Sequence, residues 1–81
     1  RFPNLNFAYE AIEKGGNMPC ILNAANEVAV SLFLEDKIGF YEMSSLIEKA
    51  MDRSAFIKEP SLSDYIQCDK ETREIIYSLV N

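Results

Sequence analysis

The amino-acid sequence predicts an all-α fold, a small bundle of four to five helices that forms a single domain over residues 1–81. Apolar residues recur at three- and four-residue spacing in successive segments, and no segment alternates apolar and polar residues for long enough to predict a sheet. With 81 residues, 48% of them hydrophobic and 26% charged, the chain can bury one small core. Three glycines, three prolines and no tryptophan also argue against a loop-rich or sandwich-like fold.

The first helix is predicted over residues 4–14. Asn4, directly after Pro3, has the side chain of a helix N-cap. Gly15 and Gly16 end the segment, because glycine favours the backbone conformation that follows a helix C-terminus. The apolar residues of this helix fall at helical spacing: Leu5, Phe7, Ala8, Ala11 and Ile12.

The second helix is predicted to begin after Asn17 and to stop near Lys37. Pro19 is tolerated in its first turn, where the missing N–H would have no partner in any case. Apolar side chains occupy most of the circumference of this segment from Cys20 to Leu34. Because a helix that is apolar almost all round is usually the central one, we expect it in the middle of the bundle.

A short extended crossing is predicted next, with Ile38 and Phe40 buried against their neighbours. It leads into an amphipathic helix over residues 42–53, and residues 54–60 then form a loop. The apolar face of this third helix follows the helical pattern: Met43, Leu46, Ile47, Ala50 and Met51.

The C-terminal part of the chain predicts two helical pieces. Ser61 and Asp64 resemble a capping box that opens a short turn ending near Cys68. Asp69 is a suitable N-cap for a last helix, with Glu71 in its first turn, where an acid favours the helix dipole. That helix has one apolar face: Ile75, Ile76, Leu79 and Val80.

Composition excludes several classes of function. The sequence has no histidine, which rules out Ser-His-Asp and Cys-His nucleophiles and zinc sites that need imidazole. The net charge of −5 and the pI near 4.6 argue against binding to nucleic acid or to an anionic membrane surface. Cys20 and Cys68 are too few for a disulfide framework and match no metal motif, so we expect two buried small hydrophobic side chains in a reducing cytosol.

One polar cluster interrupts the apolar second helix. Asn23, Asn26 and Glu27 are spaced to share one helix face, with Ser31 one turn further on. They could be ligands for a metal or a substrate, but one carboxylate with two amides is a poor site for a hard cation. The favoured interpretation is structural: they form hydrogen bonds that fix a loop or a docked domain, or they are the solvated stripe of the helix.

A second interpretation of the whole chain is a free-standing acidic helical carrier or protein-interaction module. Acyl carrier proteins are small, acidic and helical, and they carry their prosthetic group on the serine of an Asp-Ser-Leu motif. Ser44-Ser45-Leu46 lies at the start of the predicted third helix, but Ser44 stands where that motif has aspartate. Serines in a first helical turn usually serve as caps. A mass gain at Ser45 after treatment with a phosphopantetheinyl transferase would favour the carrier.

The stretch RFPNLNFAYEA at residues 1–11 resembles the FPxLxLAxEA stretch of the 1-deoxy-D-xylulose 5-phosphate reductoisomerase family. The run LNAANEVAV at residues 22–30 fits the same family. Further elements match it in order and spacing: Gly15-Gly16, and Phe33-Leu34 before Ile38-Gly39-Phe40. The family's closing helix is matched more loosely by Ser63-Asp64, Asp69 and Arg73-Glu74. The chain is therefore similar to the helical bundle that ends these enzymes.

The resemblance implies a larger parent enzyme. In that family a Rossmann domain binds NADPH, and a central domain binds the substrate and a divalent metal, Mg²⁺ or Mn²⁺. The parent would rearrange a ketose phosphate and reduce it to 2-C-methyl-D-erythritol 4-phosphate for isoprenoid-precursor synthesis. It would be a homodimer in the bacterial cytoplasm, or in a plastid if the source is a plant. A chain that opens with Arg1 fits a piece of such a protein.

The resemblance carries no catalytic, cofactor-binding or metal-binding residue onto this chain, because those residues belong to the family's other domains. We therefore expect the fragment to be inactive by itself and to support the cofactor-binding and catalytic domains of its parent. Asn23, Asn26 and Glu27 are the candidates for polar contacts with those domains, since polar groups that become covered need partners. Neither nucleic acid nor a membrane is an expected partner.

Overall fold

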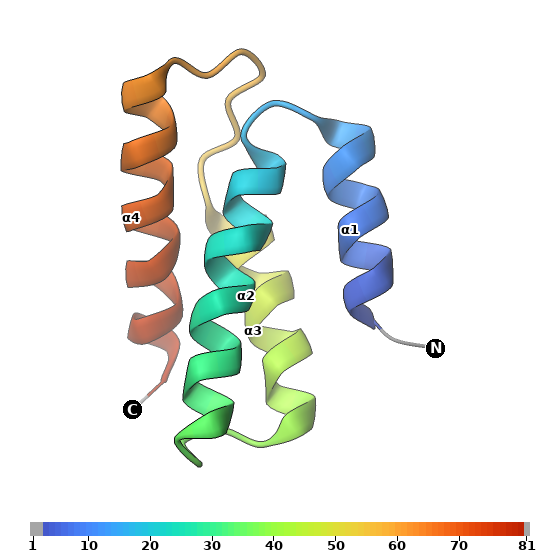
Figure 1. Cartoon of the computed structure of the whole chain (residues 1–81), viewed down its shortest axis with the longest axis vertical. Coiled ribbons are helices and arrows are strands. Elements are labelled where there is room, and N and C mark those ends of the chain that lie inside the picture. Colours follow the sequence, from blue (N-terminus) through green and yellow to red (C-terminus); the bar gives the residue numbers. More distant parts are fainter. Residues whose placement is uncertain (1–2, 81) are drawn as a thin grey trace.

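The computed structural model describes residues 3–80, and this part of the chain contains four helices and no strand. They are α1 (Pro3–Lys14), α2 (Met18–Leu34), α3 (Phe40–Arg53) and α4 (Leu62–Leu79), as Figure 1 shows. The prediction of an all-α bundle is confirmed, with the lower of the two expected helix numbers.

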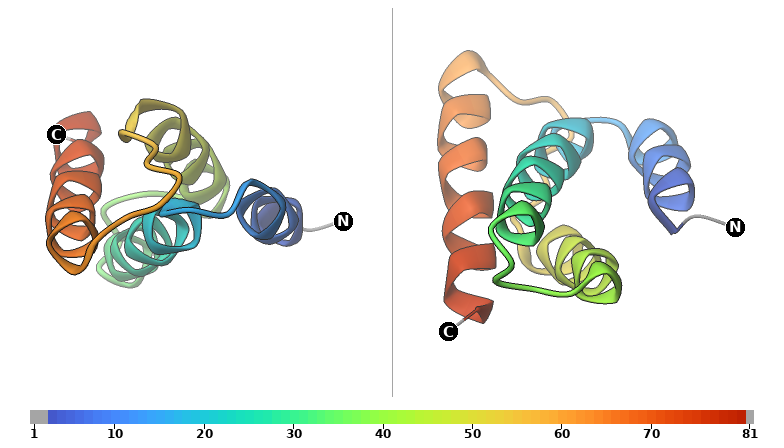
Figure 2. Two further views of the ribbon diagram at one scale, coloured as in Figure 1. Left: turned by 90° about the horizontal axis from the view of Figure 1, so that it is seen from above. Right: turned by 60° about the horizontal axis from the view of Figure 1, so that its bottom comes forward.

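Helix α2 is the central helix, as predicted. It packs against α1, α3 and α4, and Figures 1 and 2 show α1 and α4 on opposite sides of it. Ile21, Ile47 and Ile76 are fully buried and bring α2, α3 and α4 together. Burying an isoleucine side chain contributes about 1.5–3 kcal/mol, so these three residues anchor the core. The buried residues of α2 follow the helical period: Met18, Ile21, Ala24, Ala25, Val28, Ala29 and Leu32.

Helix α1 begins at Pro3, one residue before the predicted cap Asn4. Phe7 and Ala11 are buried, so they form the face that packs on the rest of the bundle. Ile12 is 75% exposed, although the pattern counts it among the apolar positions of the helix. The helical period places Ile12 about 100° around the helix from Ala11, away from that buried face.

Helix α2 ends at Leu34, three residues before Lys37, because the chain turns through a left-handed residue at Asp36, with φ of 59°. Ile38 is buried as predicted. Phe40 is not: it is 52% exposed and begins α3, where its ring packs edge-on against Phe33 at 6.0 Å between centroids. The expected burial of Phe40 is therefore wrong, because its place at a helix start turns it outward.

The N-terminus of α3 is capped without serine. The backbone N–H of Gly39 donates to Glu42 Oε1 at 2.8 Å, and Gly39 holds the extended conformation of an N-cap. Since α3 begins at Phe40, Ser44 and Ser45 lie in its second turn and do not cap it. The capping role expected for these two serines is wrong.

Helix α4 is continuous from Leu62 to Leu79, where the sequence predicted a break before Asp69. The capping box at its start is present: Asp64 N donates to Ser61 Oγ at 3.2 Å, and Ser61 N donates to Asp64 Oδ2 at 2.9 Å. Asp69 does not cap a helix but accepts a hydrogen bond from Arg73 Nε at 3.0 Å, one turn further on. An i, i+4 pair of opposite charge stabilises helix at the position of the predicted break.

Candidate functional site

The polar cluster of α2 divides between two sides of the helix. Asn23 and Asn26 line a groove between α1 and α2, whereas the carboxylate of Glu27 accepts a hydrogen bond from Arg73 of α4. Asn26 and Glu27 therefore face different neighbours, α1 for the amide and α4 for the carboxylate. The sequence grouped three residues that the structure does not bring together at one site.

Arg73 connects α2 to α4 through two carboxylates. Its Nη2 atom lies 2.7 Å from Glu27 Oε1, and its Nε atom lies 3.0 Å from Asp69 Oδ2. The hydrogen bonds to Asp69, and then to Glu27, raise the pKa of Arg73 further above its ordinary value. The side chains of Arg73 and Glu27 are 34% and 57% exposed, so the pair contributes only up to about 1 kcal/mol. We call these three residues the Arg73 clamp.

Asn17 is a fully buried polar residue that joins three segments of the chain. Its Nδ2 atom donates to the Ala55 carbonyl at 2.9 Å and lies 3.4 Å from Cys68 Sγ, and its Oδ1 atom accepts from the Ile57 N–H at 2.8 Å. The sequence marked Asn17 only as the residue before a helix. Gly15 and Gly16, which precede Asn17 and have positive φ, were the signal available in the sequence, because such glycines mark a sharp turn. This turn brings Asn17 against the loop of residues 54–61.

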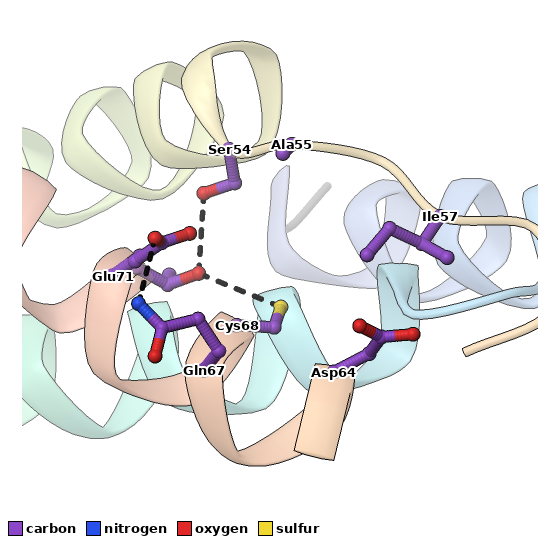
Figure 3. Close-up of a pocket in the computed structure, with 8 residues that line it drawn as sticks. Ser54, Ala55, Ile57, Asp64, Gln67, Cys68 and Glu71 are labelled. Carbon is purple, nitrogen blue, oxygen red and sulfur yellow. Dashed lines mark hydrogen bonds between the residues drawn. The ribbon is translucent and has the colours of Figure 1, made fainter. Parts of the chain in front are cut away.

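Figure 3 shows a small cleft between that loop and α4. Its volume is about 50 Å³, which is room for a water molecule or two and not for a metabolite. The hydroxyls of Ser54 and Thr72 are 3.1 Å apart, and Gln67 Nε2 donates to Glu71 Oε2 at 2.8 Å. These polar side chains pair with one another, so the cleft is a structural contact between the loop and the helix.

The two cysteines lie beside each other where α2 meets α4, and both are free thiols. Cys68 is buried, and Cys20 is half-buried, with its Sγ donating to the Tyr65 carbonyl at 3.7 Å. Burial, and then the neighbouring Cys68, raise the pKa of Cys20 to about 11. A thiol with that pKa stays protonated at neutral pH and is a poor nucleophile.

A second hollow is a groove between α1 and α2, with a volume of about 360 Å³. We call it the α1–α2 groove. Two alanines on its α1 side have small side chains and leave the hollow open. The lining residues are Ala8, Ala11 and Ile12 from α1, and Pro19, Leu22, Asn23 and Asn26 from α2.

Two further features are absent from residues 3–80. Acidic and thiol side chains form no cluster of three or more that could hold a metal ion. None of the described helices is both long enough and apolar enough to cross a lipid bilayer.

Comparison with known proteins places this arrangement in a family. The family described as the DXP reductoisomerase C-terminal domain matches residues 1–75. The chain is 54% identical over 81 residues to the 1-deoxy-D-xylulose 5-phosphate reductoisomerase of Phocaeicola vulgatus, and 55% identical over 80 residues to that of Bacteroides thetaiotaomicron. The two matches include 100% and 99% of this chain but only 21% and 20% of the respective relatives.

A solved structure gives the same result. The reductoisomerase of Zymomonas mobilis in complex with NADPH matches 96% of this chain and 21% of its own, with a TM-score of 0.87 and 42% identity. The chain thus spans about a fifth of the length of its relatives. With residues 1–75 matched by the family and about half of all positions identical to its members, this chain belongs to the DXP reductoisomerase C-terminal domain family.

Proposed function

We propose that this chain is the supporting helical bundle of an NADPH-dependent 1-deoxy-D-xylulose 5-phosphate reductoisomerase, and that it has no active site of its own. The observation that carries the proposal is the likeness to the NADPH-bound enzyme of Zymomonas mobilis over 96% of this chain. The parent enzyme would rearrange a ketose phosphate, reduce it with NADPH and use Mg²⁺ or Mn²⁺ as a Lewis acid.

The residues of this bundle fit neither NADPH nor a divalent metal ion. The sequence has no Gly-rich phosphate-binding loop, and the carboxylates and thiols of the described residues do not gather into a metal-binding cluster. We therefore assign no step of the reaction to this chain. Its contribution is a rigid core, tied together by buried isoleucines, the Arg73 clamp and the hydrogen bonds of Asn17.

Within this proposal, Asn23 and Asn26 make polar contacts with the other domains of the parent, and Glu27 acts from within the bundle. The support for this division is geometric, since the two amides line the α1–α2 groove and Glu27 is bound to Arg73. Once covered, the exposed Asn23 amide needs hydrogen-bond partners, and another domain would supply them.

The substitution Asn26→Leu in the parent enzyme tests the supporting role. Losing an amide from a covered polar contact costs about 1–3 kcal/mol, so both the unfolding midpoint and turnover should fall. The same substitution in the isolated 81-residue chain is the control, because it reports the effect of Asn26 within the bundle alone. Equal effects in the two contexts, or unchanged stability and turnover in the parent, would contradict the proposed contact.

The activity of the parent is tested by its consumption of NADPH. The purified enzyme should oxidise NADPH only when 1-deoxy-D-xylulose 5-phosphate and Mg²⁺ or Mn²⁺ are both present, and should release 2-C-methyl-D-erythritol 4-phosphate. A parent that consumes no NADPH under these conditions would refute the assignment of function.

A further inference from the structure

The α1–α2 groove combines an apolar floor with an exposed apolar side chain on its wall. Ile12 is 75% exposed, and Tyr9, three residues earlier on the same side of α1, is 66% exposed. Both side chains would be removed from water if another surface covered this side of α1. An isoleucine beside a hollow lined by Ala8 and Leu22 is typical of a site that receives an apolar side chain.

The surface of α1 next to the groove carries negative charge, and we call it the acidic rim. Glu10 and Glu13 are exposed on α1, and they surround an adjoining hollow together with Tyr9 and Ile12. Lys14 is the one basic residue of α1, and its ammonium group lies over the Phe56 ring, 4.6 Å from the ring centre. The surface therefore favours a partner that presents apolar side chains flanked by lysine or arginine.

Helix α1 also lies at the edge of the bundle. It packs against α2 and α3 but not against α4, and both views in Figure 2 show it set apart at one side. A helix in this position has more of its surface left for a partner than α2 or α3 has.

The relatives indicate what that partner is. About four fifths of their length lies outside the region matched by this chain, and the matched region is their C-terminal domain. In such a polypeptide the remaining chain therefore precedes the matched region and is joined to the bundle through α1. A second copy of the bundle fits less well, because its acidic rim would meet an identical acidic rim.

We propose that the α1–α2 groove is the docking surface for an apolar segment with flanking basic residues from the preceding part of the same polypeptide. Ile12 is the anchor of this contact, and Glu10 and Glu13 pair with the basic residues at its edge. The inference rests on the proposed function, because it requires this chain to be part of a larger reductoisomerase.

The test compares two substitutions in two contexts. Ile12→Glu changes the groove, and Leu62→Glu is the matched control, because Leu62 is 77% exposed on α4 at the opposite side of α2. In the isolated chain both substitutions should leave the melting temperature nearly unchanged, since both side chains are exposed. In the parent, Ile12→Glu should lower the melting temperature by about 2 °C or more, and Leu62→Glu should leave it unchanged. Equal shifts for both substitutions in the parent, or none for Ile12→Glu, would overturn the proposal.

A second measurement does not depend on the stability of a variant. A photoreactive phenylalanine analogue placed at residue 12 of the parent should cross-link to a peptide from the preceding part of the same polypeptide. Cross-links between two copies, or none above the level of the same analogue at residue 62, would refute the docking surface. Because the unaltered parent is assayed separately for NADPH oxidation, the groove can fail while the proposed function stands.

Discussion

Asn17 and Ile57 exchange hydrogen bonds in both directions across the bundle. The backbone N–H of Asn17 donates to the Ile57 carbonyl at 2.9 Å, and the backbone N–H of Ile57 donates to Asn17 Oδ1 at 2.8 Å. The residues are 40 positions apart in the sequence, so this pair fixes the turn between α1 and α2 against the loop that leads into α4. The loop between α3 and α4 contains no helix, so this contact holds it in place against the bundle.

Replacing Asn17 by alanine should lower the free energy of unfolding by about 2–4 kcal/mol. The substitution leaves the Ile57 N–H and the Ala55 carbonyl, both partly buried, without the amide that now pairs with them. Urea titration of the isolated chain measures the loss. Asn23→Ala is the control, because Asn23 is exposed and its replacement should change stability by less than about 0.5 kcal/mol. Similar losses for the two variants would contradict this account of Asn17.

Gly16→Ala should destabilise the chain much more than Gly15→Ala. Both glycines have positive φ, at 56° and 70°, which costs a non-glycine residue about 1–2 kcal/mol. A Cβ atom on Gly16 would also overlap the Ile57 carbonyl oxygen, whereas one on Gly15 would have nothing within 4 Å. Urea titration of both variants provides the comparison. Equal losses would show that the close approach of the two backbones is not present in solution.

The Arg73 clamp should show a small coupling that depends on salt. A double-mutant cycle with Glu27→Gln and Arg73→Met should give an interaction energy of about 0.5 kcal/mol, because both side chains are partly exposed. Raising the salt concentration to about 1 M should reduce this energy by screening the charges. A coupling near zero at low salt, or one that appears only in the parent, would show that Glu27 pairs with something other than Arg73.

Cys20 should make the chain less stable at alkaline pH. Its pKa is raised from 9.0 to about 11, so between these values the folded protein keeps a proton that the unfolded chain releases. Stability from this group is therefore complete below pH 9 and is lost as the pH rises towards 11. Tyrosines and lysines titrate in the same range, so the readout is the difference between wild type and Cys20→Ala. An identical slope of stability against pH in both proteins would contradict the raised pKa.

The same property predicts slow alkylation of Cys20. At pH 8 a thiol with a pKa of about 11 is roughly 100-fold less ionised than one with a pKa of 9.0. Iodoacetamide should therefore modify Cys20 about 100-fold more slowly in the folded chain than in urea, as mass spectrometry would show. Equal rates of modification in the folded chain and in urea would contradict the raised pKa of Cys20.

Local patterns predicted the helices well, and the pairing of side chains explains the helix break that was predicted wrongly. The apolar circumference of α2 was enough to place it at the centre, because a helix with that pattern must be covered on several sides. The break predicted before Asp69 rested on a capping preference, and the pairing of Asp69 with Arg73 one turn later favours a continuous helix instead. Propensity at a single residue is a weak signal when a side chain has another partner available.

The candidate site was less accessible to sequence reasoning than the fold. Spacing placed Asn23, Asn26 and Glu27 on one helix, but it could not show that Glu27 points to Arg73, 46 residues away. Gly15 and Gly16 mark a turn before Asn17, but they do not show that Asn17 is buried, and its partners lie in a loop about 40 residues further on. Such contacts depend on how the helices pack, which the periodicity of one segment does not specify.

The central claim is that this bundle supports a reductoisomerase whose chemistry lies in the rest of the polypeptide. Calorimetric titration of NADPH into the isolated 81-residue chain, with the parent enzyme as positive control, tests it most directly. The account predicts saturable binding to the parent and no saturable heat with the isolated chain, once its circular dichroism spectrum shows that it is helical. Saturable binding of NADPH to the folded, isolated bundle would contradict the claim.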